Sequence, residues 1–477
     1  MTHLILELTN LYQTKNNMTN YQNNDTICAV STPNGSGAIA VIRLSGSKSL
    51  EIIDTVFVRT SKELHHATCN FGTLYDGQDI VDEVVVSYFQ SPRSYTGEDV
   101  IEISCHGSRY IQQKIMELLI KKGARYALPG EFTFRAFRHG KLDLAQSEAV
   151  ADLIVSESKK AHDIAVSQLK GSYSSSIKTL RSKLIDILSL FELELDFGEE
   201  DVEFAKRDEM RQLLDDIESE LSKMIKSFEL GNSIKTGITV TIIGKPNVGK
   251  STLLNLLLNE EKAIVSEIPG TTRDVIEDVI NIDGFLFRFI DTAGLHETSD
   301  VIETIGIERT IERINQAEII LHVIDLENAE QSALTSEIQE FRNHLKNKDK
   351  KWILIGNKID KVSEKPEWIK SVFGDEMIVI SAKKHQNIEL INSKLRDYVL
   401  ERQISDRSVV TNSRHFDAMV KARESIQSAQ QAFAANISNE LISVDIRQAL
   451  YHLGSIIGEV TTEDVLETIF GKFCIGK

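Results

Sequence analysis

The sequence predicts a multidomain protein in which an α/β domain is inserted into a helical domain, with a small α+β domain in front of both. Three observations predict this arrangement. A strand, a glycine-rich loop and a helix follow one another at residues 238–258. Apolar residues recur at helical spacing on both sides of that segment, and short apolar runs typical of strands lie before residue 127. At 477 residues the chain exceeds one hydrophobic core and should form about three domains.

The N-terminal part is expected to hold a short extension and then the α+β domain. Residues 1–24 are predicted to be a disordered extension, with either Met1 or Met18 as the true start. Residues 25–137 are predicted to form the α+β domain, because short apolar runs alternate there with helical patterns. Its expected strands are residues 39–44, 84–89 and 100–105, and its expected helices lie near 47–58 and 109–122.

The helical domain is expected in two halves, residues 138–233 and 401–477, on either side of an inserted domain at residues 234–400. Apolar residues of the first half recur on one helical face. They are Val150, Leu153, Ile154, Leu180, Leu184, Ile187, Leu188 and Phe191. The pattern resumes over residues 419–435 and 444–457. We therefore expect the two halves to meet in one helical bundle.

The inserted domain begins with a signature of phosphate binding. After the apolar residues 238–243 comes Gly244-Lys245-Pro246-Asn247-Val248-Gly249-Lys250-Ser251, and the leucines of a helix follow. In such a strand, loop and helix, backbone N–H groups and the helix N-terminus hold a polyphosphate. Lys250 is then expected to reach the outer phosphates and the Ser251 hydroxyl to bind Mg²⁺. The expected contacts of this loop are Asn247, Val248, Gly249, Lys250, Ser251 and Thr252.

Three further motifs, each after an expected strand, indicate a P-loop GTPase domain of the Ras-like α/β class. The strand at 285–290 delivers an acid that reaches Mg²⁺ through water and a glycine that faces the γ-phosphate. After the strand at 352–355, the Asp360 carboxylate can accept two hydrogen bonds from a guanine edge, which adenine does not offer. The strand at 377–380 leads to a loop expected to close over the base. The motif residues are Asp291, Thr292, Ala293, Gly294, Asn357, Lys358, Asp360, Ser381, Ala382 and Lys383.

The segment between the first two motifs is the expected switch I. Thr272 is predicted to supply the second Mg²⁺-binding hydroxyl. Leu295 follows Gly294, where Ras-like enzymes carry a water-orienting Gln, so this domain must position its water in another way. The side-chain carbonyl of Asn247 could ligate a monovalent cation, although a turn-stabilising role is the alternative. Together with residues 266–272 the pattern resembles the potassium-activated GTPases. The expected K⁺ ligands are Asn247, Ser266, Ile268 and Thr271.

Composition and charge limit the remaining classes. The net charge of −17 argues against a generally basic nucleic-acid coat. A basic cluster at residues 121–141 is equally compatible with an RNA-binding patch and with solvated helix flanks. The acidic residues 192–203 are expected to form a loop between helices. The four cysteines are scattered, without zinc or disulfide spacing, and no apolar run reaches the ~18 residues of a membrane span, so a cytoplasmic protein is expected.

Longer motifs outside the inserted domain then resemble one family, the tRNA-modification GTPases MnmE (also called TrmE). The matching segments span residues 25–477 in collinear order. They include Ile42-Arg43-x-Ser45-Gly46, Tyr95-Thr96-Gly97-Glu98-Asp99, Cys105-His106-Gly107, Pro129-Gly130-Glu131-Phe132-Thr133-x-Arg135, Gly140-Lys141-Leu142-Asp143-Leu144 and Phe473-Cys474-Ile475-Gly476-Lys477.

The resemblance implies a function beyond GTP hydrolysis. With an FAD-containing partner of the MnmG (GidA) family, in a heterotetramer or larger complex, such a homodimeric protein adds an aminomethyl or carboxymethylaminomethyl group to C5 of the wobble uridine (U34) of certain tRNAs. The one-carbon unit comes from 5-formyltetrahydrofolate or a related folate. The family's folate contacts fall on Arg43, Glu98, Lys141 and Lys477. A carboxylate suits the donor edge of a pterin, and the cations suit the carboxylates of the folate's glutamate.

Two more residues receive roles from the resemblance. Glu303 occupies the position of the family's water-positioning glutamate beyond switch II. Cys474 is a candidate catalytic residue of the modification, with burial without reactivity as the equal alternative.

Two other functions are weighed against this one. A ribosome-assembly or signalling GTPase would share the central motifs but lack the Arg43, Glu98 and Lys141 set. A folate-binding module with a vestigial GTPase domain would have lost residues such as Lys250 and Asp360, which are intact.

Overall fold

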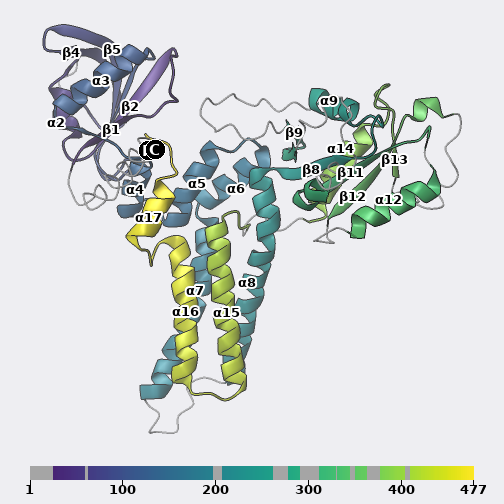
Figure 1. Ribbon diagram of the computed structural model, residues 1–477. Helices are drawn as coiled ribbons and strands as arrows, with labels where there is room; N and C mark the ends of the chain where they lie inside the picture. Colours follow the sequence, from purple (N-terminus) through teal and green to yellow (C-terminus); the bar gives the residue numbers. More distant parts are fainter. Residues whose placement is uncertain are drawn as a thin grey trace, which may run out of the picture. The chain divides into compact units, whose positions relative to one another are not determined.

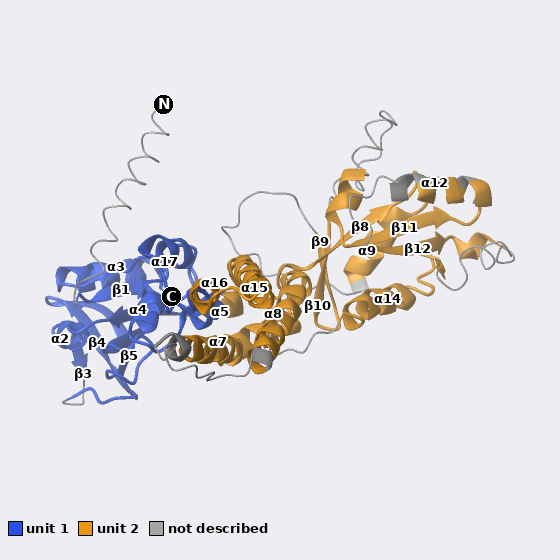
Figure 2. Ribbon diagram, turned by 90° about the horizontal axis from the view of Figure 1, so that it is seen from below, with its two compact units in different colours: residues 1–151, 453–477 blue, residues 152–452 orange. Residues whose placement is uncertain are grey.

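The computed structural model describes residues 25–59, 63–196, 207–260, 278–290, 311–328, 330–343, 350–362, 377–402 and 409–476. The chain divides into two compact units (Figure 2). Unit 1 comprises the residues up to Ala151 together with those from Leu453 onward, and unit 2 comprises Asp152–His452. None of the described helices combines the length and the apolar character that crossing a bilayer requires.

Unit 1 is built on a seven-stranded sheet in the order β3-β4-β5-β6-β2-β1-β7. All neighbours are antiparallel except β1 and β7. The strands are β1 Ile27–Val30, β2 Ile39–Ser45, β3 Phe57–Arg59, β4 Thr68–Asp76, β5 Asp79–Phe89, β6 Val100–His106 and β7 Arg125–Tyr126. The helices are α2 Ser49–Asp54, α3 Arg109–Lys121, α4 Glu131–Arg138 and α5 Leu144–Ile154, which continues into unit 2. The three strands and two helices expected from the sequence are confirmed, and β1, β3, β4 and β7 are additional.

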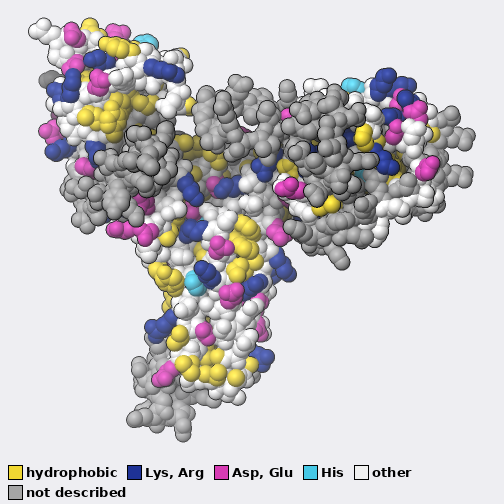
Figure 3. All heavy atoms as spheres, in the orientation of Figure 1, with side chains coloured by type: hydrophobic (Ala, Val, Ile, Leu, Met, Phe, Trp, Pro, Cys, Tyr) yellow, Lys and Arg dark blue, Asp and Glu magenta, His cyan; other side chains and the backbone are white. Residues whose placement is uncertain are grey.

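One face of this sheet is covered by α2 and α3, and the other is covered by α4 at β1, where Ile27 and Ala29 pack with Phe132, but is open elsewhere. Alternate residues such as Ile42, Val86 and Ile103 are fully buried and pack with residues of α2 and α3 in the core. Their neighbours in the strands point to the opposite face, where Phe71 of β4 lies directly across from Val85 of β5. Phe71 is 62% exposed and Ile39 of β2 is 67% exposed. Hydrophobic side chains are visible on the surface of this unit, at the upper left of Figure 3.

The C-terminal residues are anchored in unit 1. In α17 (Glu463–Phe470), the ring of Phe470 is 1% exposed and meets that of Phe134 edge-on, with centroids 5.2 Å apart. The carbonyl of Cys474 accepts a hydrogen bond from the N–H of Gly130 at 3.4 Å. The carbonyl of Gly476 accepts one from the Ser31 hydroxyl at 3.1 Å. The residues from Leu453 onward, which the sequence analysis groups with the second helical half, thus contact the N-terminal residues.

The helices on both sides of the inserted domain form one bundle (Figure 1). They are α6 Lys159–Leu169, α7 Ser172–Asp196, α8 Arg207–Thr236, α15 Ser413–Ala434 and α16 Asn439–Ile457, whose last residues belong to unit 1. α8 and α15 pack along each other, and the rings of Phe228 and Phe416 stack between them with centroids 4.4 Å apart. The expectation of a loop at residues 192–203 is wrong in part. α7 continues to Asp196, because its helical pattern is not interrupted by Gly or Pro, and residues 197–206 lie outside the described part.

The α/β domain in unit 2 has a six-stranded sheet in the order β13-β12-β11-β8-β10-β9. All neighbours are parallel except β9 and β10. The strands are β8 Ile238–Ile243, β9 Asp278–Ile282, β10 Phe285–Phe289, β11 Ile319–Asp325, β12 Lys351–Asn357 and β13 Met377–Val379. The helices are α9 Lys250–Glu260, α12 Gln331–Asn343 and α14 Glu389–Leu400. The four strands expected in this domain are confirmed, and so is its place as an insert between helices of one bundle.

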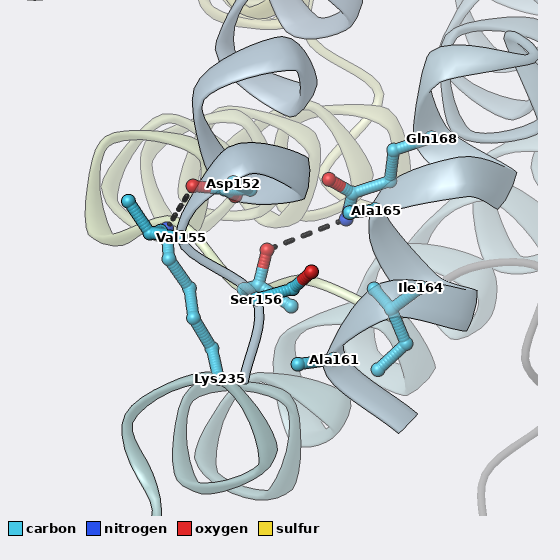
Figure 4. A pocket seen from close by; sticks show the side chains of 9 residues that line it. Asp152, Val155, Ser156, Ala161, Ile164, Ala165, Gln168 and Lys235 are labelled. Atoms are coloured by element: carbon cyan, nitrogen blue, oxygen red, sulfur yellow. Dashed lines mark hydrogen bonds and ion pairs between the residues drawn. The ribbon is translucent and has the colours of Figure 1, made fainter. Parts of the chain in front are cut away.

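The α/β domain touches the bundle at the start of α6. The backbone N–H of Lys160 donates to the carbonyl of Gly284, in the turn between β9 and β10, at 3.2 Å. A small pocket lies nearby, where the end of α8 approaches α5 and α6 (Figure 4). In it Lys235 Nζ pairs with Asp152 Oδ1 at 2.7 Å, and Gln168 donates to the carbonyl of Val409 at 3.1 Å. The hydrogen bond of Lys160 thus joins the α/β domain to α6, and the other two contacts join helical segments that flank this domain in the sequence.

Candidate functional site

The phosphate-binding loop connects β8 to α9. Gly244 leaves the strand with φ 141°, and a Cβ there would lie 2.1 Å from the carbonyl oxygen of Val323, so only glycine fits. Gly249 has φ 101°, and its Cβ would lie 2.2 Å from Asn357 Nδ2. Lys250 Nζ donates to the carbonyls of Gly244 and Lys245, at 2.8 Å each, from within the loop. The loop is therefore wrapped around its own lysine, with Ser251 and Thr252 in the first turn of α9.

The base side of the site is organised by Asn357, at the end of β12. Its Nδ2 donates to the carbonyl of Val248 at 2.8 Å, and its Oδ1 accepts from the N–H of Ala382 at 3.0 Å. Asn357 is 3% exposed and thus ties the phosphate loop to the loop after β13. These two hydrogen bonds bring together three motifs that are more than 20 residues apart from one another in the sequence.

Asp360 lies beside this junction with its carboxylate exposed to solvent. The Ser381 hydroxyl donates to Asp360 Oδ1 at 2.6 Å, and this hydrogen bond is the main reason that the pKa of Asp360 lies below its ordinary value. Asp360 is consequently ionised at neutral pH and can accept hydrogen bonds from a bound base. Ser381 has a role that the sequence analysis did not assign, because it fixes the carboxylate as well as belonging to the loop over the base.

Asp325 is a site residue that sequence reasoning missed. It ends β11 and pairs with Lys358 at 2.6 Å, in a pocket of about 410 Å³ that is also lined by Asn247 and Val248. Burial opposes ionisation of Asp325, but hydrogen bonds from Lys358 and Asn328 outweigh it and lower the pKa. The signal was present, because Asp325 follows an apolar run just as Asp291 and Asn357 do.

Part of the predicted site lies outside the described residues. This applies to the expected switch residues, the second motif, the water-positioning glutamate and the terminal lysine. They are Ser266, Ile268, Thr271, Thr272, Asp291, Thr292, Ala293, Gly294, Glu303 and Lys477. Of the predicted cation ligands, Asn247 and Ser251 are described. Asn247 has φ 63°, a left-handed conformation that Asn tolerates well.

The second candidate site is in unit 1, around the segment from Tyr95 to Glu98. Arg43 donates from Nη2 to Glu102 Oε1 at 2.8 Å, and its guanidinium lies over the ring of Tyr95, 5.3 Å from the centroid. Lys141 Nζ donates to the carbonyl of Pro92 at 3.0 Å, and the Lys141 side chain lies against Gly97. The structure therefore places Arg43, Glu98 and Lys141 around one short segment.

Glu98 itself is held by two residues that the sequence analysis did not assign to the site. The Ser45 hydroxyl donates to Glu98 Oε2 at 2.7 Å, and Arg135 Nη1 donates to the same oxygen at 3.0 Å. The side chain of Glu98 remains 20% exposed. Glu98 is therefore accessible to a ligand, although Ser45 and Arg135 already fix the orientation of its carboxylate.

The basic cluster at residues 121–141 does not form one exposed surface. Arg125 and Arg135 are both bound to the fully buried carboxylate of Glu131. Lys121 pairs with Asp76 at 3.2 Å. The two central arginines of the cluster are therefore engaged in internal ion pairs, which argues against an RNA-binding patch.

The cysteines differ in exposure. Burial raises the pKa of Cys28 to about 12 and that of Cys105 to about 11, so both remain thiols. Cys474 is exposed, so the expected alternative of burial is wrong, and its catalytic role stays a prediction. Its exposed thiol lies next to the anchored residues Phe473 and Gly476.

Family models and curated proteins agree with this architecture. The family model described as "GTP-binding protein TrmE N-terminus" matches residues 26–141, and the one described as "MnmE helical domain" matches residues 144–474. Proteins named "tRNA modification GTPase MnmE" from Christiangramia forsetii, Flavobacterium psychrophilum and Bacteroides fragilis are each 48% identical to this chain. The matches cover 95% of this chain and 99%, 99% and 100% of those proteins. Among solved structures, the FeoB G-domain from Methanococcus jannaschii covers 34% of this chain and 98% of its own, with 23% identity and a TM-score of 0.25.

Proposed function

Since this chain belongs to the MnmE (TrmE) family of tRNA modification GTPases, we propose that its GTP hydrolysis controls the addition of a (carboxymethyl)aminomethyl group to C5 of the wobble uridine (U34) of certain tRNAs. The observation that carries the proposal is the junction at Asn357, which ties the phosphate loop to the loop beside Asp360. That arrangement supports a GTP site at the carboxyl ends of parallel strands. The protein acts in the cytoplasm, with an FAD-dependent partner of the MnmG (GidA) family in a heterotetramer or larger complex.

The wobble uridine itself provides the test of this function. We expect a bacterial strain that lacks its own protein of this family to regain the C5-modified uridine when this chain is expressed, as measured by mass analysis of tRNA nucleosides. A ribosome-assembly or signalling GTPase is the competing function. Unmodified uridine together with altered ribosome subunit profiles would favour that function instead.

The residues at the phosphate loop fit Mg²⁺ and K⁺ as cofactors. Both ions prefer oxygen ligands, and Ser251 and Asn247 offer a hydroxyl and a side-chain carbonyl on either side of Lys250. When bound, the two cations supply positive charge for the phosphates during hydrolysis. Ser251 and Thr272 are assigned to Mg²⁺. K⁺ is assigned to Asn247, Ser266, Ile268 and Thr271, and it promotes pairing of two α/β domains.

Potassium dependence gives a direct prediction. GTP turnover should be at least about tenfold faster in KCl than in NaCl at equal ionic strength, because only the larger cation fits a shell of loop oxygens in place of an arginine finger. Steady-state phosphate release measures both rates. Equal rates in the two salts would exclude the potassium mechanism.

The second site supports folate binding. Glu98 offers an oriented carboxylate for N–H donors, while Arg43 and Lys141 bring positive charge to the same segment. Lys477 completes the assigned set, and Glu303 and Cys474 are assigned to water positioning and to the modification chemistry. A folate bound there supplies the one-carbon unit.

Arg43→Ala tests this assignment. It should weaken binding of 5-formyltetrahydrofolate about 10- to 100-fold, the usual effect of losing a charge-assisted hydrogen bond, and leave GTP turnover unchanged. Isothermal titration and phosphate release measure the two effects. Arg59→Ala is a matched control, because Arg59 also pairs with an acid, Asp54, and lies over an aromatic ring, but on β3. Loss of GTP turnover with intact folate affinity would contradict the assignment.

The open face of the sheet in unit 1 supports a homodimer. Val58, Phe71 and Val85 lie there on the adjacent strands β3, β4 and β5 and are 60%, 62% and 37% exposed, and apolar side chains exposed together often mark an interaction surface. A second copy of the same face would cover them symmetrically, as in most homodimers.

A further inference from the structure

Glu98 belongs to a cluster of five charged side chains in unit 1. Arg135 of α4 is at its centre, with a side chain that is 9% exposed. Its Nη1 donates to both oxygens of Glu98, at 3.2 and 3.0 Å, and to the backbone carbonyl of Asp25 at 2.9 Å. Its Nη2 donates to Asp25 Oδ1 at 2.7 Å and to Glu131 Oε1 at 3.0 Å. The terminal nitrogens of Arg135 therefore hold three acidic residues at once.

Arg125 closes the cluster on the side away from Glu98. It donates from Nη1 and Nη2 to the two oxygens of Glu131, at 2.9 and 2.7 Å, and from Nε to Asp25 Oδ2 at 2.7 Å. Glu131 is fully buried and also accepts from the N–H of Leu128. Arg125 and Arg135 thus share the same two acids, but only Arg135 contacts Glu98.

Hydrogen-bonding capacity remains on Glu98 and on Asp25, whose two oxygens each have one partner among the described residues. Both oxygens of Asp25 and both oxygens of Glu131 have partners shorter than or equal to 3.0 Å. Glu98 Oε2 has two such partners, Ser45 and Arg135, whereas Oε1 has the 3.2 Å contact with Arg135. A carboxylate oxygen accepts about two hydrogen bonds. Oε1 of Glu98, whose contact is the longest in the cluster, accordingly has room for a ligand donor.

The net charge of the cluster also favours a ligand that donates hydrogen bonds to Glu98. Two arginines face three carboxylates, so the cluster carries one excess negative charge. A ligand group that donates N–H bonds complements this charge, and a group that presents a carbonyl oxygen to Glu98 is repelled.

We propose that Arg135 is a positioning residue of the folate site, which fixes the Glu98 carboxylate so that it selects ligands with an amino-substituted, N–H-donating heterocycle edge. The inference rests on the folate binding proposed above and deepens it. Arg135 acts through Glu98 and contacts no ligand itself. A lysine at position 135 would keep the charge, but its single nitrogen cannot hold Glu98, Asp25 and Glu131 in one plane.

A double-mutant cycle on folate affinity tests the inference. The affinity for 5-formyltetrahydrofolate is measured by titration calorimetry for the full-length protein, Arg135→Lys, Glu98→Gln and the double variant. We expect each single variant to bind at least about tenfold more weakly, and the double variant to bind within about twofold of Glu98→Gln. Losses that multiply in the double variant would overturn the inference, since Arg135 would then act independently of Glu98.

Arg125→Lys is the matched control for a merely structural role. It weakens the same buried pairs with Glu131 and Asp25 but leaves the contacts of Glu98 in place. We expect it to lower the unfolding midpoint about as much as Arg135→Lys and to leave folate affinity within about twofold. An affinity loss equal to that of Arg135→Lys would assign the effect to stability and overturn the inference.

A second ligand distinguishes recognition of the amino-substituted heterocycle edge from folate binding in general. For a folate analogue with hydrogen in place of the 2-amino group, Arg135→Lys should lose less affinity than it does for 5-formyltetrahydrofolate, because one of the two N–H donors of that edge is gone while N3–H remains. A difference as large as that for 5-formyltetrahydrofolate would contradict the proposed selectivity. If the unsubstituted protein binds no folate at all, the proposed folate site fails and the inference fails with it, whereas normal binding with a multiplicative cycle contradicts the inference alone.

Discussion

Lys250→Ala should reduce GTP turnover at least about 1,000-fold and abolish wobble uridine modification with it. Lys250 lies inside the phosphate loop, with its nitrogen held by the carbonyls of Gly244 and Lys245. Its charge is the fixed positive charge that the described part of the loop offers to the outer phosphates, and the loss of one preorganised donor in such a site costs about 100- to 1,000-fold. Loss of the ammonium group removes substrate affinity as well. Single-turnover phosphate release and nucleoside mass analysis measure the two effects.

Lys351→Ala is the control for this experiment. Lys351 belongs to the same domain but starts β12, at the opposite end of the strand from Asn357, and it pairs with Glu401 at 3.7 Å. It should leave turnover within about twofold of the unsubstituted protein, as expected for an exposed ion pair. Modification that persists in Lys250→Ala without turnover would separate the chemistry from GTP hydrolysis and contradict the proposed function.

Asp360→Asn should weaken GTP binding about 100- to 1,000-fold and transfer the preference to xanthosine triphosphate. The carboxylate accepts from two N–H donors of guanine, whereas an amide offers one acceptor and one donor. Xanthine has a carbonyl where guanine has its 2-amino group, so it matches the amide. The hydrogen bond from Ser381 holds residue 360 in the same orientation in both forms. Competition with a fluorescent nucleotide measures both affinities.

Asp397→Asn provides the matched control on α14, where the carboxylate is 45% exposed and pairs with Arg396. It should leave the base preference unchanged. Equal loss of affinity for both nucleotides in Asp360→Asn would indicate that Asp360 supports the loop and does not read the base. Because the pKa of Asp360 is lowered in the folded protein, its contribution is present at neutral pH and is lost only as the pH falls through that lowered pKa.

The structure could be predicted best from the sequence where an apolar run marks a strand and a local motif follows it directly. β8, β10, β12 and β13 are apolar runs that end at motif residues, and they were found near their observed bounds. β4 contains Asn70 and Gly72 and was missed, because it becomes a strand through pairing with β5 and not through its own propensity. β11 was missed although its apolar run is visible.

The same distinction applies to the candidate sites: residues within one continuous segment were predicted, and contacts between distant segments were not. Lys250 and Ser251 were expected where the phosphate loop meets a helix and lie in the first turn of α9, since their positions depend on a continuous stretch of eight residues, whereas their roles stay predictions. The contact of Arg135 with Glu98 spans 37 residues, and that of Lys358 with Asp325 spans 33. Such contacts depend on how helices and strands pack, which neither periodicity nor spacing encodes. Arg135 was therefore interpreted as part of a surface cluster although it is buried.

The hydrogen bond between Lys160 and Gly284 makes one backbone amide a reporter of the contact between the α/β domain and the bundle. The N–H groups of a helix's first turn have no acceptor within the helix, and Lys160 is the second residue of α6. Its acceptor belongs to the turn between β9 and β10, strands that lie in sequence between the segments of Thr272 and Asp291. The deuterium uptake of this amide therefore reports whether the turn between β9 and β10 is in contact with α6. Hydrogen exchange at a single position, far in sequence from the phosphate loop, can thus follow the coupling of the two domains.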